Sequence, residues 1–118
     1  MTRYGIPPRQ RDIVLIPIPF SDLTSIKRRP VLVLSNDQHN QRSEDVLVAA
    51  MTSKLSRVPY SVRVKATDLS EGMLRKESLI RIDKIYTLSK AIIVKRFGRI
   101  SQSIFHQVIA QLDLLLGR

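Results

Sequence analysis

Short apolar runs separated by polar stretches recur along most of the chain, and they predict β-strands. Several runs are rich in Val, Ile and Leu and are bounded by polar or turn-forming residues. In residues 60–66, apolar and polar positions alternate, which is typical of a strand with one face in water. Gly98 is expected to end this pattern. The predicted strands cover residues 12–20, 30–35, 45–51, 60–66, 78–88 and 91–94.

The C-terminal segment has the spacing of an amphipathic helix. From Ile104 onward, the apolar positions fall within an arc of about 140° on a helical wheel. Ser101 or Ser103 is a candidate N-cap, and Gly117 is a candidate to end the helix. Leu114 lies outside the arc and is either a single exposed leucine or part of a second covered surface. The arc consists of Phe105, Val108, Ile109, Leu112, Leu115 and Leu116.

Five to seven short strands followed by one terminal helix predict a mainly β fold. We expect a small, strongly bent antiparallel sheet or barrel with the helix packed on it. The 118 residues suffice for one compact domain and are too few for two ordinary ones. Residues 1–118 are therefore interpreted as a single domain.

The apolar runs are too short for a membrane protein. The longest, residues 13–20, contains Pro17 and Pro19 and falls short of the roughly 18 residues that a membrane span requires. Residues 1–11 lack the pattern of a signal peptide, and the chain has no cysteine, which fits a reducing cytosol. A cytoplasmic protein is therefore expected.

The charge of the chain suggests a polyanionic or acidic partner. Twenty Lys and Arg residues against ten Asp and Glu give a formal net charge of +10, spread along the sequence. A soluble protein that is merely basic is the alternative interpretation.

Several common chemistries are disfavoured. The four glycines are isolated, so no glycine-rich loop can hold a nucleotide phosphate. His39, in the predicted polar loop 36–44, and His106 are both expected to face solvent. The sequence has no Cys and no clustered His or carboxylate ligands, so neither a metal nor another cofactor is predicted.

The first candidate site is the basic block Lys27-Arg28-Arg29 before Pro30. It closes the predicted polar loop 21–29 at the entrance of a strand, and proline restricts the backbone of Arg29 to extended conformations. A fixed guanidinium can hold two phosphate oxygens at once. A block that is simply solvated is the alternative.

Two further candidates are polar residues at strand ends. Thr52 and Ser53 directly follow an apolar run, and their hydroxyls can position a phosphate or a 2′-OH, although such pairs are also common in turns. Arg81 and Asp83 are two residues apart, which places them on one face of a strand. They are either a proton-transfer pair or a structural ion pair.

Taken together, these blocks resemble the MazF/PemK family of toxin endoribonucleases over nearly the whole chain. The first strand, the Arg-Pro strand with its following loop, the strand ending in Thr, and the Arg-x-Asp strand occur in the family's order, and a terminal helix follows. The matching blocks are RDIV (11–14), RPVLVLS (29–35), VAAMTS (48–53) and LIRID (79–83).

The resemblance implies specific roles for the candidate residues. Arg29 and Thr52 would be the catalytic pair, with Arg29 stabilising the phosphorane and Thr52 holding a non-bridging oxygen. Asp83, oriented by Arg81, would be the base. The residues expected to bind RNA are Lys27, Arg28 and Ser53.

The sequence departs from the family pattern in three places. Arg11 replaces the usual glycine, residues 21–28 lack the frequent Gly-Ser-Glu-Gln stretch, and Lys84 stands where glutamine is common. None of these changes removes Arg29 or Thr52.

The implied protein is an SH3-like, MazF/PemK-type barrel that acts as the toxin of a type II toxin-antitoxin system. It would cleave single-stranded RNA without a metal, through attack of a 2′-OH that leaves a 2′,3′-cyclic phosphate and a 5′-OH. A homodimer and an acidic antitoxin partner are also implied. The alternative is a basic barrel that cuts nothing and binds nucleic acid or a protein target such as DNA gyrase.

Overall fold

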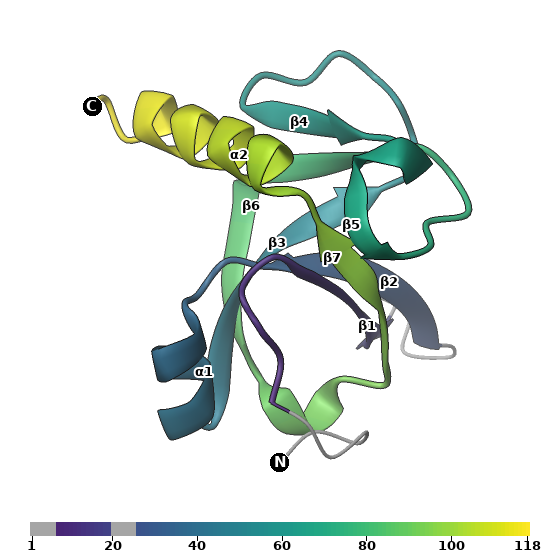
Figure 1. The fold of residues 1–118 in the computed structure, drawn as a ribbon, viewed down its shortest axis with the longest axis vertical. Helices are drawn as coiled ribbons and strands as arrows, with labels where there is room; N and C mark the ends of the chain where they lie inside the picture. Colours follow the sequence, from purple (N-terminus) through teal and green to yellow (C-terminus); the bar gives the residue numbers. More distant parts are fainter. Residues whose placement is uncertain (1–6, 20–25) are drawn as a thin grey trace.

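A computed structural model describes residues 7–19 and 26–118 of the chain. Seven strands form one strongly curled sheet, and the C-terminal helix lies across it (Figure 1). The strands are β1 (Asp12–Pro19), β2 (Ile26–Val33), β3 (Asp45–Thr52), β4 (Ser61–Val64), β5 (Leu69–Gly72), β6 (Ser78–Ser89) and β7 (Lys95–Ile100). The helices are α1 (Asp37–Arg42) and α2 (Gln102–Leu115), with short 3-10 turns η1 (Ala66–Asp68) and η2 (Lys90–Ile92).

The strands follow the order β4-β6-β3-β2-β1-β7-β5, and each neighbouring pair is antiparallel. The prediction of a mainly β fold with a C-terminal helix is confirmed, with a strand number at the top of the predicted range. In the described part of the chain, β4 and β5 form the two edges. The expected barrel therefore takes the form of a curled, open sheet.

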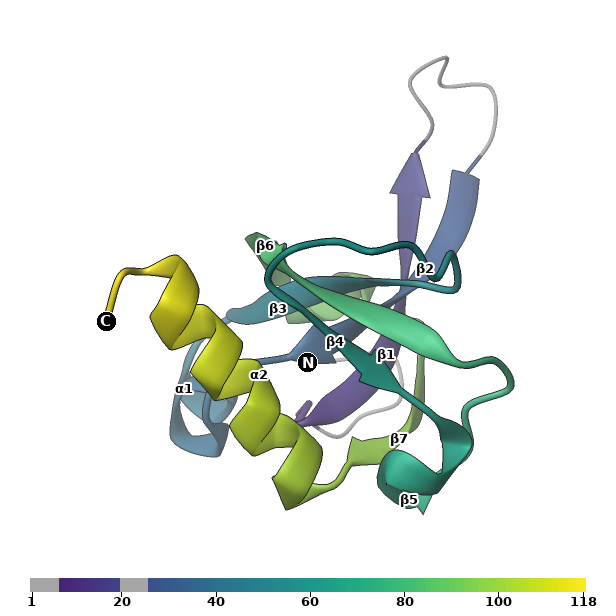
Figure 2. The same cartoon turned by 90° about the horizontal axis from the view of Figure 1, so that it is seen from above.

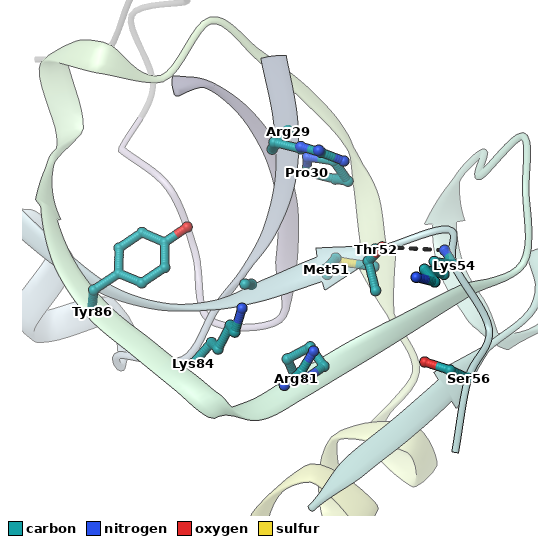
Figure 3. Close-up of a pocket in the computed structure, with 10 residues that line it drawn as sticks. Arg29, Pro30, Met51, Thr52, Lys54, Ser56, Arg81, Lys84 and Tyr86 are labelled. Atoms are coloured by element: carbon teal, nitrogen blue, oxygen red, sulfur yellow. Dashed lines mark hydrogen bonds between the residues drawn. The ribbon is translucent and has the colours of Figure 1, made fainter. Parts of the chain in front are cut away.

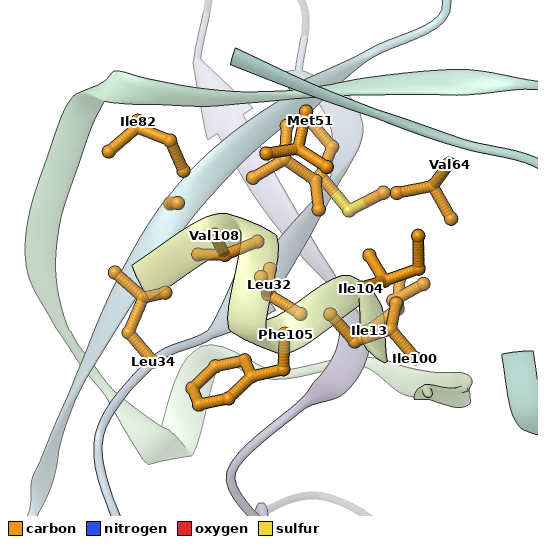
Figure 4. Packing of buried hydrophobic residues seen from close by; sticks show 13 residues of the cluster. Ile13, Leu32, Leu34, Met51, Val64, Ile82, Ile100, Ile104, Phe105 and Val108 are labelled. Carbon is orange, nitrogen blue, oxygen red and sulfur yellow. The ribbon is translucent and has the colours of Figure 1, made fainter. Parts of the chain in front are cut away.

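Both faces of the central strands are buried, which explains why their sequences are almost continuously apolar. On one face, Leu32 and its neighbours pack beneath Phe105 of α2 (Figure 4). On the other face, Val31 packs with Leu88 at the end of β6 and with Ile93 after η2. The curl of the sheet thus separates two apolar clusters, one on each side of β1, β2 and β3.

Helix α2 begins and ends where the sequence predicts. The Ser101 hydroxyl oxygen accepts a hydrogen bond from the Ile104 N–H at 3.2 Å, and Gly117 ends the helix with a φ of 78°. Figure 2 shows α2 lying across β4 and β6, with which it is in contact. Its last turn is not covered in the same way, because Leu114 and Leu116 are 59% and 61% exposed.

None of the helices in residues 7–19 and 26–118 is long and apolar enough to cross a membrane.

Strand β2 is longer than the sequence predicts. Its ladder with β1 begins at the pair Pro19 and Ile26, so the strand starts at Ile26 rather than at residue 30. The basic block 27–29 therefore lies inside a strand and not in a loop, which corrects the prediction. Residues 21–25 of the predicted loop, and Phe20 at the end of the predicted first strand, lie outside the described residues.

Other segments also differ from the prediction. Residues 91–94, predicted as a strand, belong to η2 and its connection to β7, and the polar residues 36–44, predicted as a loop, contain α1. Gly98 lies inside β7 and does not end the pattern, because its missing side chain lets Gly72 of β5 approach closely. A Cβ at Gly98 would collide with the Glu71 carbonyl oxygen. This contact adds β5 to the sheet, and neither β5 nor β7 was predicted from the sequence.

Candidate active site

A pocket of about 580 Å³ opens beside β2, β3 and β6 (Figure 3). Its charged lining residues are Arg29, Lys54, Arg81 and Lys84, and no Asp or Glu among the described residues lines it. A concave site with clustered cations and no carboxylate suits an anionic ligand such as a phosphodiester. The rest of the described lining consists of Pro30, Ala50, Met51, Thr52, Ser56 and Tyr86.

Strands β2 and β3 bring Arg29 and Thr52 to the same pocket. Val31 pairs with Ala50, and continuing this antiparallel register by two residues places Arg29 opposite Thr52. Both side chains share the face of Val31 and Ala50, because residues two apart on a strand point the same way. The β1–β2 ladder and the ring of Pro30 together hold the Arg29 backbone more firmly than the predicted loop would.

The backbone after β3 orients the Thr52 hydroxyl. Its oxygen accepts a hydrogen bond from the Lys54 N–H at 3.1 Å (Figure 3). This bond uses a lone pair, so the hydroxyl hydrogen can donate to an oxygen in the pocket. The adjacent Ser53 is exposed and lines a second, adjoining pocket, which lies beside Leu74 and Phe97.

Arg81 and Asp83 form a two-bonded ion pair on β6. Arg81 Nε and Nη2 donate to the two Asp83 oxygens at 2.8 and 2.7 Å. This hydrogen bonding lowers the pKa of Asp83 and raises the pKa of Arg81. Arg81 lines the pocket, whereas Asp83 is not among its lining residues. The geometry does not favour Asp83 as the base, because both oxygens are engaged and a lowered pKa weakens a carboxylate as a base.

A bulge in β6 exposes Lys84 and Tyr86 to the same pocket. The β3–β6 register shifts between Ala49 and Ala50, which leaves residues 82–84 of β6 outside the ladder. Tyr86 is half-buried, and burial raises its pKa, so its phenol is a neutral donor. The bulge leaves no pattern in the sequence, so the sequence did not predict a pocket position for Tyr86. Lys54 and Ser56, which follow the end of β3, were not predicted either.

The remaining candidate residues lie outside this pocket. Lys27 and Arg28 are exposed and line the second pocket together with Ser53. His39 on α1 and His106 on α2 are both exposed, as predicted. Within the described ranges, no three His, Asp or Glu side chains gather into a potential metal site.

Comparison with known proteins assigns the family. A family model described as "PemK-like, MazF-like toxin of type II toxin-antitoxin system" matches residues 9–116. The chain belongs to this family. Among curated relatives, Endoribonuclease MazF of Staphylococcus saprophyticus is 30% identical over 89 residues, covering 75% of this chain and 73% of the relative. Endoribonuclease MazF of Staphylococcus epidermidis is 32% identical over 89 residues, with the same two coverages of 75% and 73%.

Solved structures share the PemK/MazF fold. A mycobacterial endoribonuclease, solved in complex with its cognate antitoxin, superposes with a TM-score of 0.77 at 19% identity, covering 93% of this chain and 95% of the other. A MazE-MazF crystal structure from Deinococcus radiodurans gives a TM-score of 0.77 at 20% identity, with coverages of 95% and 98%. These likenesses show that the solved structures share the fold of this chain over nearly its whole length.

Proposed function

We propose that this PemK/MazF family toxin is an endoribonuclease that cleaves single-stranded RNA without a metal ion. Curated relatives are named endoribonucleases. The observation that carries the proposal is the placement of Arg29 beside Thr52, in a pocket whose described lining holds four cations and no carboxylate. Such a pocket attracts a phosphodiester and supplies donors for the charge that develops on it.

In the proposed reaction, the 2′-OH of one nucleotide attacks its own 3′-phosphate and the P–O5′ bond breaks. The 2′-OH proton passes in net terms to the departing 5′-oxygen, which leaves a 2′,3′-cyclic phosphate and a 5′-OH. The Arg29 guanidinium is planar and always charged, so it can donate to two phosphate oxygens and stabilise the phosphorane. The Thr52 hydroxyl hydrogen holds a non-bridging oxygen, since its acceptor side is already bonded to Lys54.

Arg81 provides a second guanidinium from β6, on the side of the pocket opposite Arg29 (Figure 3). Asp83 is a positioning residue in this scheme, because its two hydrogen bonds fix the Arg81 guanidinium plane. This role replaces the sequence-based assignment of Asp83 as the base.

The proposal is tested by incubating the purified protein with a long single-stranded RNA in excess EDTA. The expected result is cleavage at defined positions, with 2′,3′-cyclic phosphate and 5′-OH ends. Binding without cleavage would favour the non-catalytic alternative. Cleavage that vanishes in EDTA and returns with magnesium or manganese would contradict the roles given to Arg29 and Thr52.

The toxin is proposed to be a cytoplasmic homodimer of single-domain chains, inhibited by an acidic antitoxin. The exposed leucines at the end of α2 support the dimer, because a cluster of apolar side chains in water is a typical subunit contact. The formal charge of +10 supports an acidic partner. The solved relatives include an endoribonuclease in complex with its cognate antitoxin.

A further inference from the structure

A second pocket, of about 760 Å³, adjoins the first at the end of β3. The two pockets share four lining residues, so they meet at the catalytic pair. The shared residues are Arg29, Pro30, Met51 and Thr52.

The two pockets open toward opposite faces of the sheet. Val31 and Leu32 belong to different apolar clusters, one on each face. Tyr86 of the first pocket packs on the cluster that contains Val31, whereas Phe97 of the second pocket packs on the cluster that contains Leu32. Since β3 ends at Thr52, a ligand strand can pass around that end from one pocket to the other.

Cations surround the second pocket, and no Asp or Glu among the described residues lines it. Arg96 is engaged by Asp12 and Glu71, at 3.0 and 2.9 Å, and so forms part of the wall. The other cations that line only this pocket form no ion pair with any carboxylate that the structure describes. They are Lys27, Arg28, Arg75, Lys76 and Lys95.

The same pocket also has an apolar side. Phe97 and Leu74 are half-buried and pack on the cluster beneath α2, while Met73 is 77% exposed. Lys95 Nζ lies 5.3 Å from the centre of the Phe97 ring, so a cation and an aromatic surface occur together. An apolar surface beside phosphate-binding cations is the combination that binds a base and its phosphate in single-stranded nucleic acids.

We infer that the second pocket binds the nucleotide that adjoins the cleaved bond on the same RNA strand. This inference rests on the proposed function. The base lies against Met73 and Phe97, and its outer phosphate contacts Lys95. The cleaved phosphodiester crosses the end of β3 at Arg29 and Thr52. The first pocket then holds the nucleotide on the other side of the bond.

Equilibrium binding of a short RNA with a 2′-deoxy nucleotide at the mapped cleavage position tests this subsite, because that RNA cannot undergo the reaction. Lys95→Ala should weaken binding about tenfold and reduce the steepness of log K against log salt by about 0.7, the value for one single-strand phosphate contact. Arg42→Ala removes the same charge from an exposed position on α1 and is the matched control. Equal effects of the two variants would overturn the subsite.

A second experiment addresses the base. An abasic nucleotide is placed on either side of the cleaved bond, and the loss of binding is measured for the wild type and for Met73→Ala. On one side only, we expect a wild-type loss of about tenfold that Met73→Ala largely abolishes, since a stacked base contributes at this scale. Because Met73 is 77% exposed, Met73→Ala should leave the fold intact, and an unchanged melting temperature checks this.

The outcomes separate the two claims. If the wild type binds RNA but never cuts it, the proposed function fails, and Lys95→Ala is compared with Arg42→Ala on unmodified RNA. If the wild type cuts RNA but Met73→Ala changes neither abasic response, the subsite is wrong while the nuclease assignment stands.

Discussion

At the scale of single residues, the backbone at Arg11 explains why glycine is usual in the family at this position. Its φ is 79°, in the left-handed region that favours the usual glycine and costs other residues about 1 kcal/mol. Its side chain donates to the Ile100 carbonyl oxygen at 2.8 Å, which offsets part of that cost. The next residue, Asp12, is 2% exposed, pairs with Arg96 and Arg99 and lines neither pocket, so this motif position stabilises the fold.

Replacing Thr52 by valine removes the hydroxyl while keeping the side chain's shape. We expect the single-turnover cleavage rate to fall by about 10²-fold, as for the loss of one preorganised donor to a developing oxyanion. Thr67→Val makes the same change at an exposed position on η1 and should leave the rate unaltered. A Thr52→Val rate within twofold of the wild type would rule out the proposed hydrogen bond to the phosphate.

The Arg81–Asp83 pair predicts a particular pH dependence. The pKa of Asp83 is lowered, so the carboxylate stays ionised and paired while the pH falls to about 4, the ordinary pKa of an aspartate. The contribution of the ion pair is lost only at lower pH. The cleavage rate should therefore show no acid limb from Asp83 between about pH 5 and 8. A pH–rate profile of wild type and Asp83→Asn measures this directly.

The same pair gives a double-mutant test of the role of Asp83. If Asp83 only positions Arg81, then Asp83→Asn, Arg81→Ala and the double variant should each lower the rate by a similar factor, about tenfold. A loss of 10³-fold or more in Asp83→Asn, with little effect of Arg81→Ala, would restore Asp83 as the general base.

At the scale of elements, the sequence predicts those strands and helices whose positions are set by the periodicity of apolar residues. The runs that became β1, β3, β4 and β6 and the helix α2 were located correctly, because burial on one or both faces dictates their composition. Strand β5 was missed because its four residues have little apolar character, and α1 because polar residues fill it. The motifs predict Arg29 and Thr52 as site residues, and the structure places both at one pocket. The bulge that brings Tyr86 to the pocket depends on tertiary pairing, which no local pattern reveals.

The contact between β5 and β7 predicts a specific loss of stability. Gly98→Ala would force a Cβ against the Glu71 carbonyl and should lower the free energy of unfolding by about 2–4 kcal/mol, as for other backbone clashes. Gly117→Ala, at a φ of 78° but with open space around it, should cost only about 1 kcal/mol. Urea denaturation of both variants gives the comparison, and equal losses would show that the β5 contact is not tight.

At the scale of the whole molecule, the positive charge is concentrated where the ligand is expected to bind. Ten of the 20 Lys and Arg residues line one pocket or the other, whereas none of the described Asp and Glu residues does. The positive charge is therefore unevenly distributed over the molecule, which the composition alone could not show. Long-range attraction of RNA or of an acidic antitoxin to this surface follows.

Oligomeric state and antitoxin binding test this picture. Light scattering should give twice the 13.5 kDa of one chain, and Leu116→Arg should shift it toward the monomer, while Gln107→Arg adds the same charge elsewhere on α2 and should not. An acidic antitoxin peptide should inhibit cleavage with an affinity that falls as salt rises. A wild-type monomer at micromolar concentration, or inhibition indifferent to salt, would contradict the proposed assembly.

The central claim is that Arg29 stabilises the transition state of RNA cleavage and does not merely attract RNA. The most direct test is the single-turnover rate at saturating protein for Arg29→Ala, compared with Lys27→Ala two residues earlier on the same strand. We expect Arg29→Ala to lower this rate by about 10²-fold or more with little change in RNA affinity, while Lys27→Ala mainly weakens binding. Small and equal effects of the two substitutions would reduce this part of β2 to a basic patch and contradict the account.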